Sequence, residues 1–202
     1  MTILESEAEL RGCYEPPNDV VQKKILARLD QHARAFIALS PFVVLATHGP
    51  DGADASPRGD APGFVQVLDD TTLLLPDRRG NNLIDSLRNV VAAPDVGLLF
   101  LVPGINETLR VNGTARIVTD ADRLAPLAAQ GKLPTSALEV SVREVFFHCG
   151  KAMIRSKLWQ AESQVPRSGF PSLGRVIADQ IAGVDAEAAE RNIEEAYKSR
   201  LY

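Results

Sequence analysis

The sequence predicts a mainly β protein with flanking helices (α+β), built on a six-stranded antiparallel β-barrel. About six apolar, strand-sized runs follow one another in meander order, and only short helical segments lie between and around them. This order favours a small closed barrel over a parallel sheet. A Rossmann domain is not expected, because no strand–helix alternation carries a G-x-G-x-x-G turn. With 202 residues, the chain has the length of a single domain with a core of ordinary size.

The composition narrows the class of partner. The formal net charge of −4 argues against a general nucleic-acid surface, although a local basic pocket remains compatible with it. The first residues lack the basic and apolar regions of a signal peptide, and no apolar run approaches the ~20 residues of a membrane span. Cys13 and Cys149 are interpreted as reduced thiols. We therefore expect a cytoplasmic protein that binds neither nucleic acid nor membrane.

The chain is expected to begin with a polar arm over residues 1–18 that wraps over the surface, followed by an amphipathic helix from Asp19 to Ile37. Ser40-Pro41 ends this helix, because the residue before a proline disfavours the helical conformation. The apolar run Phe42–Thr47 then predicts a buried strand. After a turn, a second strand leads into a loop at Ser56–Gly59.

Three further strands are expected in the second half of the barrel, at Val96–Val102, Glu107–Val118 and Ser136–Phe147. The barrel would then occupy residues 42–150. Residues 160–202 begin with a proline-containing loop and continue with two helical patterns, so they are expected to form a helical extension of the same domain.

A hairpin lies at the centre of the predicted site. Its apolar runs, Phe64–Leu68 and Thr72–Leu75, flank the turn-forming pair Asp69-Asp70. A basic loop adjoins each outer end of this hairpin. Because antiparallel strands bring their outer ends to the same side, Arg58 and Arg79 should lie close together.

The loop after the hairpin also predicts the start of a helix over Asn82–Val91, with Asn81 or Asn82 as the N-cap. Free N–H groups at a helix start, beside the guanidinium groups of Arg58 and Arg79, suit a phosphate ester. The alternative is an ordinary hairpin with solvated arginines at its ends. Other cations at strand ends also favour an anionic ligand, although Arg110 could instead pair with Glu107. These further cations are Arg110, Lys151, Arg155 and Lys157.

Other kinds of site have weaker support. No C-x-x-C or H-x-x-x-H spacing exists, so no metal site is expected. A Ser-His-Asp triad lacks the G-x-S-x-G turn that often holds its serine. Cys149 could act as a nucleophile, because Lys151 and a helix start could lower its pKa, but a small buried residue at a strand end is the simpler interpretation. The sequence thus indicates no catalytic residue.

Several motifs together resemble one family. S-P-R-G-D, the hairpin, L-P-D-R-R-G-N-N, a helix, A-P-D-V-G-L-L-F and E-T-L-R-V-N-G follow in the order of the pyridoxamine 5′-phosphate oxidase-like FMN-binding split barrels. The later F-H-C-G-K-A-x-I-R-S-x-L-W sequence resembles the branch of uncharacterised FMN-dependent proteins. The resemblance covers about Phe36–Trp159. It implies FMN as the cofactor, and a homodimer with FMN between its subunits.

The resemblance also implies site residues. Arg58 would reach the FMN phosphate, the loop after the hairpin would wrap the phosphate and ribityl chain, and Thr108 would replace a glutamine that meets the flavin ring. Arg110 stands at a family arginine on the same strand. The complete predicted cofactor-binding set is Arg58, Gly59, Pro76, Asp77, Arg79, Asn81, Asn82, Thr108, Arg110, Lys151 and Arg155.

Three departures from the oxidases bear on the substrate. R-G-N-N replaces their S-R-K triplet, the spacing from that loop to Ala93-Pro94 is longer, and their C-terminal W-x-x-x-x-x-R-L-x-x-R segment is not matched. We therefore expect FMN binding without pyridoxamine phosphate as the substrate. The expected function is a flavin-dependent oxidoreductase for a small molecule, with NADH or NADPH as a candidate reductant. The alternatives are a non-catalytic flavin carrier or sensor, and a split barrel that uses a deazaflavin or haem.

The segment after the last strand has two interpretations. Lys151 and Arg155 are i, i+4 neighbours on a predicted helix and so face one way, with Trp159 nearby. They could close over the flavin or an anionic substrate in the partner's site. Alternatively, this is a surface helix whose cations pair with the acidic segment Glu187–Glu195 and whose Trp159 belongs to the core.

Overall fold

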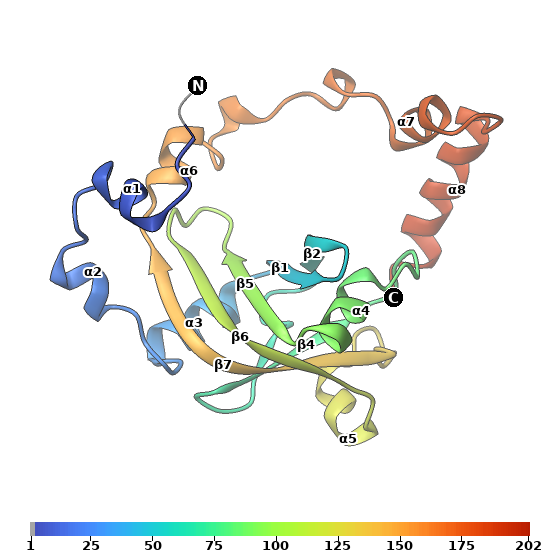
Figure 1. The fold of residues 1–202 in the computed structure, drawn as a ribbon. Helices are drawn as coiled ribbons and strands as arrows, with labels where there is room; N and C mark the ends of the chain where they lie inside the picture. Colours follow the sequence, from blue (N-terminus) through green and yellow to red (C-terminus); the bar gives the residue numbers. More distant parts are fainter. Residues whose placement is uncertain (1–2) are drawn as a thin grey trace.

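The structure is a computed structural model that describes residues 3–202. Its centre is one antiparallel sheet of seven strands in the order β2-β1-β5-β6-β7-β4-β3, which curls into a barrel (Figure 1). The predicted antiparallel barrel with flanking helices is confirmed, with seven strands instead of six. The strands are β1 (Phe42–Gly49), β2 (Gly52–Gly59), β3 (Gln66–Val67), β4 (Thr72–Asp77), β5 (Asp95–Leu101), β6 (Thr108–Val118) and β7 (Ser136–His148).

Strand β2 is longer than the sequence pattern predicts. Its last residues, Ser56–Gly59, are not a loop but pair with β1 up to Phe42↔Gly59. Pro57 can take part because β2 is an edge strand bonded only to β1, and a proline on an edge need not remove a ladder hydrogen bond. This pairing fixes Arg58 on the wall of the barrel.

The barrel interior is filled by alternate residues of the long strands, as period-two side-chain geometry requires. Helix α3 (Gln31–Leu39), which Asp30 caps through the Ala33 N–H, contributes Phe36 and Ile37 to the same core. The most deeply buried strand residues include Val43, Leu45, Leu73, Leu98, Phe100, Leu109, Val111, Leu138 and Val140.

The prediction of one long helix from Asp19 to Ile37 is wrong. Helix α2 (Asp19–Lys23) ends early, and α3 begins eight residues later. In between, Leu26 exchanges backbone hydrogen bonds with Val145 of β7, and the Leu29 N–H donates to Asp70. These bonds to the barrel replace the helical ones.

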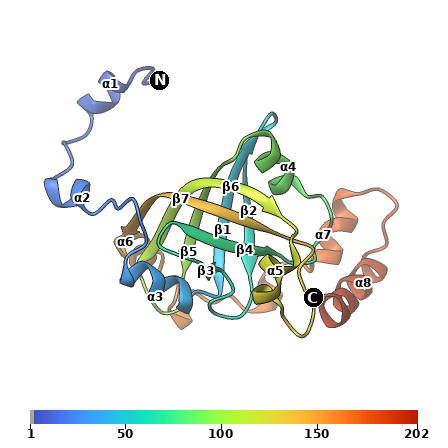
Figure 2. The ribbon, with the colours of Figure 1, turned by 90° about the horizontal axis from the view of Figure 1, so that it is seen from below.

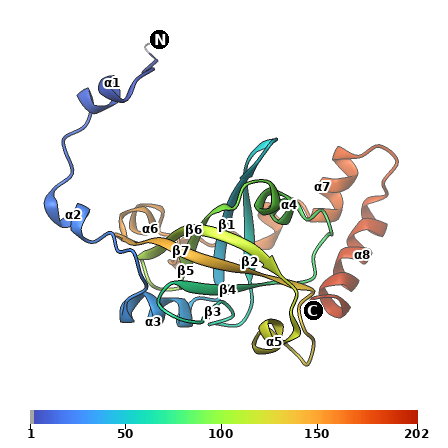
Figure 3. The same ribbon diagram turned by 60° about the horizontal axis from the view of Figure 1, so that its bottom comes forward.

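The N-terminal arm does not wrap over the surface of the barrel as predicted but extends away from it (Figures 2 and 3). Its helix α1 (Glu7–Gly12) and the following α2 bury no residue. Residues 1–2 of this arm lie outside the part of the chain that the structure describes.

The hairpin is confirmed as β3–β4, but the helix after it starts later than expected. Helix α4 spans Asp85–Ala92, and Ile84, not an asparagine, stands at its N-cap. Asn82 instead adopts a left-handed conformation (φ 62°), and the Asn81 side chain accepts a hydrogen bond from the Leu83 N–H. Asparagine suits both arrangements, which form a turn ahead of the helix.

The remaining helices lie outside the barrel, and α7 and α8 stand away from it to one side (Figure 1). They are α5 (Ala121–Leu124), α6 (Lys151–Ser156), α7 (Leu173–Gln180) and α8 (Ala186–Ser199), with 3₁₀ turns at Ala125–Leu127, Ala161–Ser163 and Arg167–Gly169. Helices α7 and α8 touch closely at Gly174, where a Cβ atom would lie 2.6 Å from the Glu190 nitrogen. Between residues 3 and 202, no helix is both long and apolar enough to cross a bilayer.

The barrel is closed on one side by side chains. Strand β3 pairs only with Leu73 and Leu74, so the end of β4 from Leu75 to Asp77 is a free edge on that side. The opposite edge of the sheet is β2. Within residues 3–202 no ladder joins β2 to β4, yet Arg58 of β2 reaches Asp77 of β4. We call this line, where the two edges meet, the seam.

Candidate functional site

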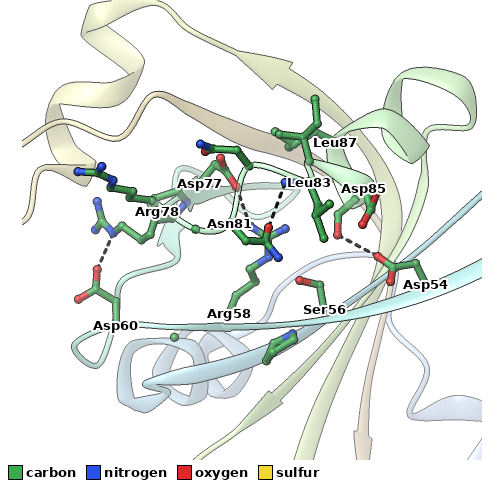
Figure 4. Close-up of a pocket in the computed structure, with 18 of the residues that line it drawn as sticks. Asp54, Ser56, Arg58, Asp60, Asp77, Arg78, Asn81, Leu83, Asp85 and Leu87 are labelled. Carbon is green, nitrogen blue, oxygen red and sulfur yellow. Dashed lines mark hydrogen bonds and ion pairs between the residues drawn. The ribbon is translucent and has the colours of Figure 1, made fainter. Parts of the chain in front are cut away.

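A cavity of about 680 Å³ lies at the seam. Its walls are β2, the end of β4, the loop that follows β4 and the start of α4 (Figure 4). Leu201 and Tyr202, from the end of the helical extension, also line it. This volume is within the usual range for small-molecule sites. We refer to it as the seam cavity.

Two ion pairs cross the seam. Arg58 Nη1 lies 2.7 Å from Asp77 Oδ1, and Arg78 Nε lies 2.6 Å from Asp60 Oδ2 (Figure 4). Arg78 also donates from Nη1 to the Leu127 carbonyl at 2.7 Å, so it is held on two sides. These arginines are about four-fifths buried, and for such pairs geometry and further hydrogen bonds decide whether the contact stabilises.

The cavity is not cationic as a whole. Three arginines line it together with four aspartates, namely Asp54, Asp60, Asp77 and Asp85. Asp60 and Asp77 are neutralised by the seam pairs, and Arg79 has no ion-pair partner within residues 3–202. Arg58 Nε is buried and has no hydrogen-bond partner. The donors left for an anion are therefore Arg79 and the free edge of Arg58.

A polar network fixes α4 beside the cavity. Asp54 accepts a hydrogen bond from the Ser86 hydroxyl at 3.0 Å and one from the Thr47 hydroxyl at 3.5 Å. The Asn89 amide in turn donates to Thr47 Oγ1 at 3.1 Å. Gly49 permits this approach, because a Cβ atom there would lie 2.1 Å from Asn89 Oδ1. The start of α4 is therefore held against β1 and β2.

The loop before α4 is strained. Ile84 adopts a left-handed conformation (φ 55°), which is unusual for a β-branched residue and costs on the order of 1–3 kcal/mol. No side chain caps the first N–H groups of α4. Because Ile84 and Asp85 line the cavity, the uncapped N–H groups at the start of α4 lie at the cavity wall.

Tyr202 also belongs to the cavity wall. Its hydroxyl donates to Asp60 Oδ1 at 2.7 Å, and this hydrogen bond raises the pKa of Tyr202. Burial raises the pKa of Asp60, but the hydrogen bonds from Tyr202, the Ala61 backbone and Arg78 outweigh it and leave that pKa below its ordinary value. Asp60 is therefore an ionised acceptor shared between Arg78 and Tyr202.

Seven of the predicted cofactor-binding residues come together in this cavity. They are Arg58, Gly59, Pro76, Asp77, Arg79, Asn81 and Asn82. Sequence reasoning missed Arg78, although it adjoins Arg79, because nothing local indicated its partner Asp60. It also missed Tyr202, for which the sequence carries no signal.

The other four predicted residues do not line the cavity of this chain. Thr108 is buried at the start of β6, and Arg110 on the same strand pairs with Glu144 at 2.5 Å instead of Glu107. Lys151 and Arg155 lie on α6, in agreement with the predicted helix, and both side chains are exposed. Neither forms an ion pair with Glu187–Glu195 in the described part of the chain.

Trp159 and Cys149 lie apart from the seam cavity. The Trp159 indole N–H donates to the Ile105 carbonyl at 2.9 Å, and the ring is half-buried. Cys149 is exposed, not buried as expected, because it lies beyond the end of β7. A hydrogen bond with the Lys151 backbone lowers the pKa of its thiol. Both cysteines are free, and residues 3–202 hold no cluster of three possible metal ligands.

The chain matches a known protein family. A family model described as pyridoxamine 5′-phosphate oxidase matches residues 29–149, which is more than half of the chain. No curated protein matches the chain.

Among solved structures, HupZ from Group A Streptococcus is similar, with 16% identity and a TM-score of 0.50 over 59% of this chain and 93% of that one. An FMN-binding protein from Syntrophomonas wolfei has 13% identity and a TM-score of 0.45, covering 58% of this chain and 84% of its own. General Stress Protein 26 from Bacillus anthracis has 16% identity and a TM-score of 0.42, covering 58% and 94%. At these identities, the likeness to HupZ concerns the fold alone.

Proposed function

Because the chain belongs to the pyridoxamine 5′-phosphate oxidase family, we propose that it binds FMN and acts as a flavin-dependent oxidoreductase on an unidentified small molecule. The flavin ring supplies the redox chemistry, so the protein has to bind, orient and tune it. The seam cavity would hold the phosphate and ribityl chain. The observation that carries this proposal is Arg58 Nε, buried at the cavity without a hydrogen-bond partner.

Arg58 fits a phosphate in spite of its pairing with Asp77. That pair uses Nη1, and a guanidinium group has five N–H donors in a planar fork. Nε and Nη2 form another edge of the fork, which is suited to two parallel bonds with phosphate oxygens. Asp77 would therefore orient Arg58 toward the ligand without occupying that edge.

Two further groups support the same placement. Arg79 lines the cavity and carries a positive charge that no ion pair neutralises in the described part of the chain. The first N–H groups of α4 are free of side-chain caps, and a helix start favours negative charge. Asp85 in the first turn of α4 opposes this effect, so Arg58 and Arg79 would supply most of the attraction.

We also propose a homodimer with FMN between its subunits. Thr108, Arg110, Lys151 and Arg155 do not line the cavity of their own chain. In the proposed dimer, the exposed side chains of Lys151 and Arg155 would reach the flavin held in the seam cavity of the other subunit. A cytoplasmic location remains a prediction from the sequence.

Turnover distinguishes an oxidoreductase from a flavin carrier or sensor. If the flavin is catalytic, NADH or NADPH should bleach its absorbance, and oxygen or a second acceptor should restore it at a catalytic rate. No bleaching by either nicotinamide, with no turnover across a panel of acceptors, would favour the carrier. An absorption spectrum of haem or of a deazaflavin would replace FMN as the cofactor.

The direct test compares FMN with riboflavin, which lacks the phosphate. Flavin fluorescence during titration of the purified protein gives both affinities. We expect FMN to bind at least tenfold more tightly, because each charge-assisted contact contributes about 1.5–3 kcal/mol. Equal affinities would overturn the placement of the phosphate, and the absence of any flavin binding would overturn the cofactor.

A further inference from the structure

The end of the helical extension returns to the seam cavity. After α6 the chain crosses the molecule to α7 and α8, which stand away from the barrel, and then comes back beside α4 (Figure 1). Leu201 and Tyr202 line the cavity there, although more than 120 residues separate them from the hairpin that forms its other wall. A ligand in the cavity would therefore meet the end of this extension.

Tyr202 makes three contacts with three different parts of the barrel. Its hydroxyl donates to Asp60 Oδ1 at 2.7 Å, and the Arg78 guanidinium carbon lies 5.8 Å from the centre of its ring. Lys132 Nζ donates to its backbone carbonyl at 3.0 Å. Asp60 and Arg78 also form one of the two ion pairs that cross the seam. Tyr202 therefore contacts the residues that hold the two edges of the barrel together.

Little else holds the extension to the barrel. Helix α8 buries no residue, and Gly174 and Glu190 join α7 to α8, not to the strands. In the described part of the chain, the hydrogen bonds between residues 160–202 and the barrel are the two made by Tyr202. The hydrogen bonds that hold the end of this segment at the cavity therefore come from one side chain and its backbone carbonyl.

We propose that residues 160–202 form a strap whose end, at Leu201 and Tyr202, covers the seam cavity, and that Tyr202 is its latch. When the Tyr202–Asp60 hydrogen bond breaks, the strap swings away and the ligand can enter or leave. The proposal rests on the proposed function only in taking FMN as the ligand, since the latch itself consists of contacts within this chain. Leu201 and the Tyr202 ring close the entrance, while the proposed phosphate-binding groups are Arg58 and Arg79.

The test is Tyr202→Phe, which removes the hydroxyl and keeps the ring. Tyr197→Phe is the matched control, because Tyr197 lies on α8 five residues before Tyr202, is 62% exposed and has no hydrogen bond to the barrel in the described residues. Stopped-flow fluorescence gives the association and dissociation rates of FMN. A latch predicts that both rates rise about threefold to tenfold in the Tyr202 variant, with a Kd changed by less than about twofold.

The rates separate a latch from an ordinary contact. If only dissociation accelerates and the Kd weakens, Tyr202 is a ligand contact and the latch is wrong. Unchanged rates in Tyr202→Phe, or equal changes in Tyr197→Phe, would also overturn it. Thermal unfolding should give nearly the same Tm for both variants, which shows that the rates do not report on damage to the fold.

A second measurement needs no flavin. Small-angle X-ray scattering of the unloaded protein should give a larger radius of gyration for Tyr202→Phe than for the wild type or Tyr197→Phe. If no variant binds FMN, the proposed function fails, and this measurement alone decides the latch. An unchanged radius would then overturn it.

Discussion

Replacing Arg58 by lysine tests how one guanidinium group serves two partners. Arg58 presents Nη1 to Asp77 at 2.7 Å, while its buried Nε has no partner in the chain. A lysine keeps the positive charge but has a single nitrogen, so it cannot bind Asp77 and a phosphate through two edges of a fork. We expect Arg58→Lys to retain the fold, because a cation still faces Asp77 across the seam.

The expected loss of FMN affinity in Arg58→Lys can be estimated from the contacts of this side chain. The lysine forfeits at least one charge-assisted bond to the phosphate, worth about 1.5–3 kcal/mol. At about 1.4 kcal/mol per tenfold, the Kd for FMN should rise about tenfold to hundredfold. The side chain is only 19% exposed, so solvent screens this contact little. Riboflavin has no phosphate, and its Kd should hardly change.

Fluorescence titration of the two flavins measures both constants. Arg88→Lys is the control, since Arg88 lies on α4 close to the site but does not line the cavity. The reasoning is refuted if Arg58→Lys weakens the binding of FMN and of riboflavin by the same factor, or if it leaves FMN binding unchanged. It is also refuted if Arg88→Lys has the same effect.

Three further predictions concern the loop, the latch and α6. Ile84→Gly should raise the free energy of unfolding by about 0.5–1 kcal/mol in denaturant titration, because relief of the left-handed strain exceeds the entropic cost of glycine; a destabilised variant would contradict this. The raised pKa of Tyr202 means that its contact with Asp60 stabilises the docked position of the strap below pH 10.0, and that this stabilisation is lost as pH rises through the higher folded value. The lowered pKa of Asp60 means that its contribution holds above pH 3.8 and is lost as pH falls through the folded value. Scattering across pH should show the strap released at both extremes, with Tyr202→Phe already released at neutral pH. Arg155→Ala should weaken binding of FMN or substrate while the dimer and its Tm stay nearly unchanged; a lower Tm with intact binding would make α6 scaffold.

The sequence predicted the parts of the site that depend on local pattern. The hairpin follows from two apolar runs around Asp69-Asp70, and its antiparallel strands carry Arg58 and Arg79 into one cavity. Local pattern failed where the sheet overrides propensity. Proline and glycine in Ser56–Gly59 indicated a loop, but pairing with β1 makes this stretch a strand. Asn82 indicated a helix cap and instead forms the turn before it.

Other parts of the site had no signal in the sequence at all. The contact between Tyr202 and Asp60 joins residues 142 positions apart, and the pair Asp60–Arg78 depends on how far the sheet curls. No spacing rule relates such residues, because the closure of the barrel brings them together. The alternative pairing of Arg110 with Glu107 was wrong for the same reason, because its partner Glu144 comes from the neighbouring strand β7.

The seam also gives the barrel a mechanical character. A closed ring of backbone hydrogen bonds resists widening in every direction, whereas a ring cut along one line can spring open there with its ladders intact. In this barrel the two cut edges are fastened by the pairs Arg58–Asp77 and Arg78–Asp60. Slow opening motions of the barrel should therefore occur mainly along the seam. A ligand that contacts both edges would cross-link them. Its binding should stiffen the entire ring, including the strands opposite the cut.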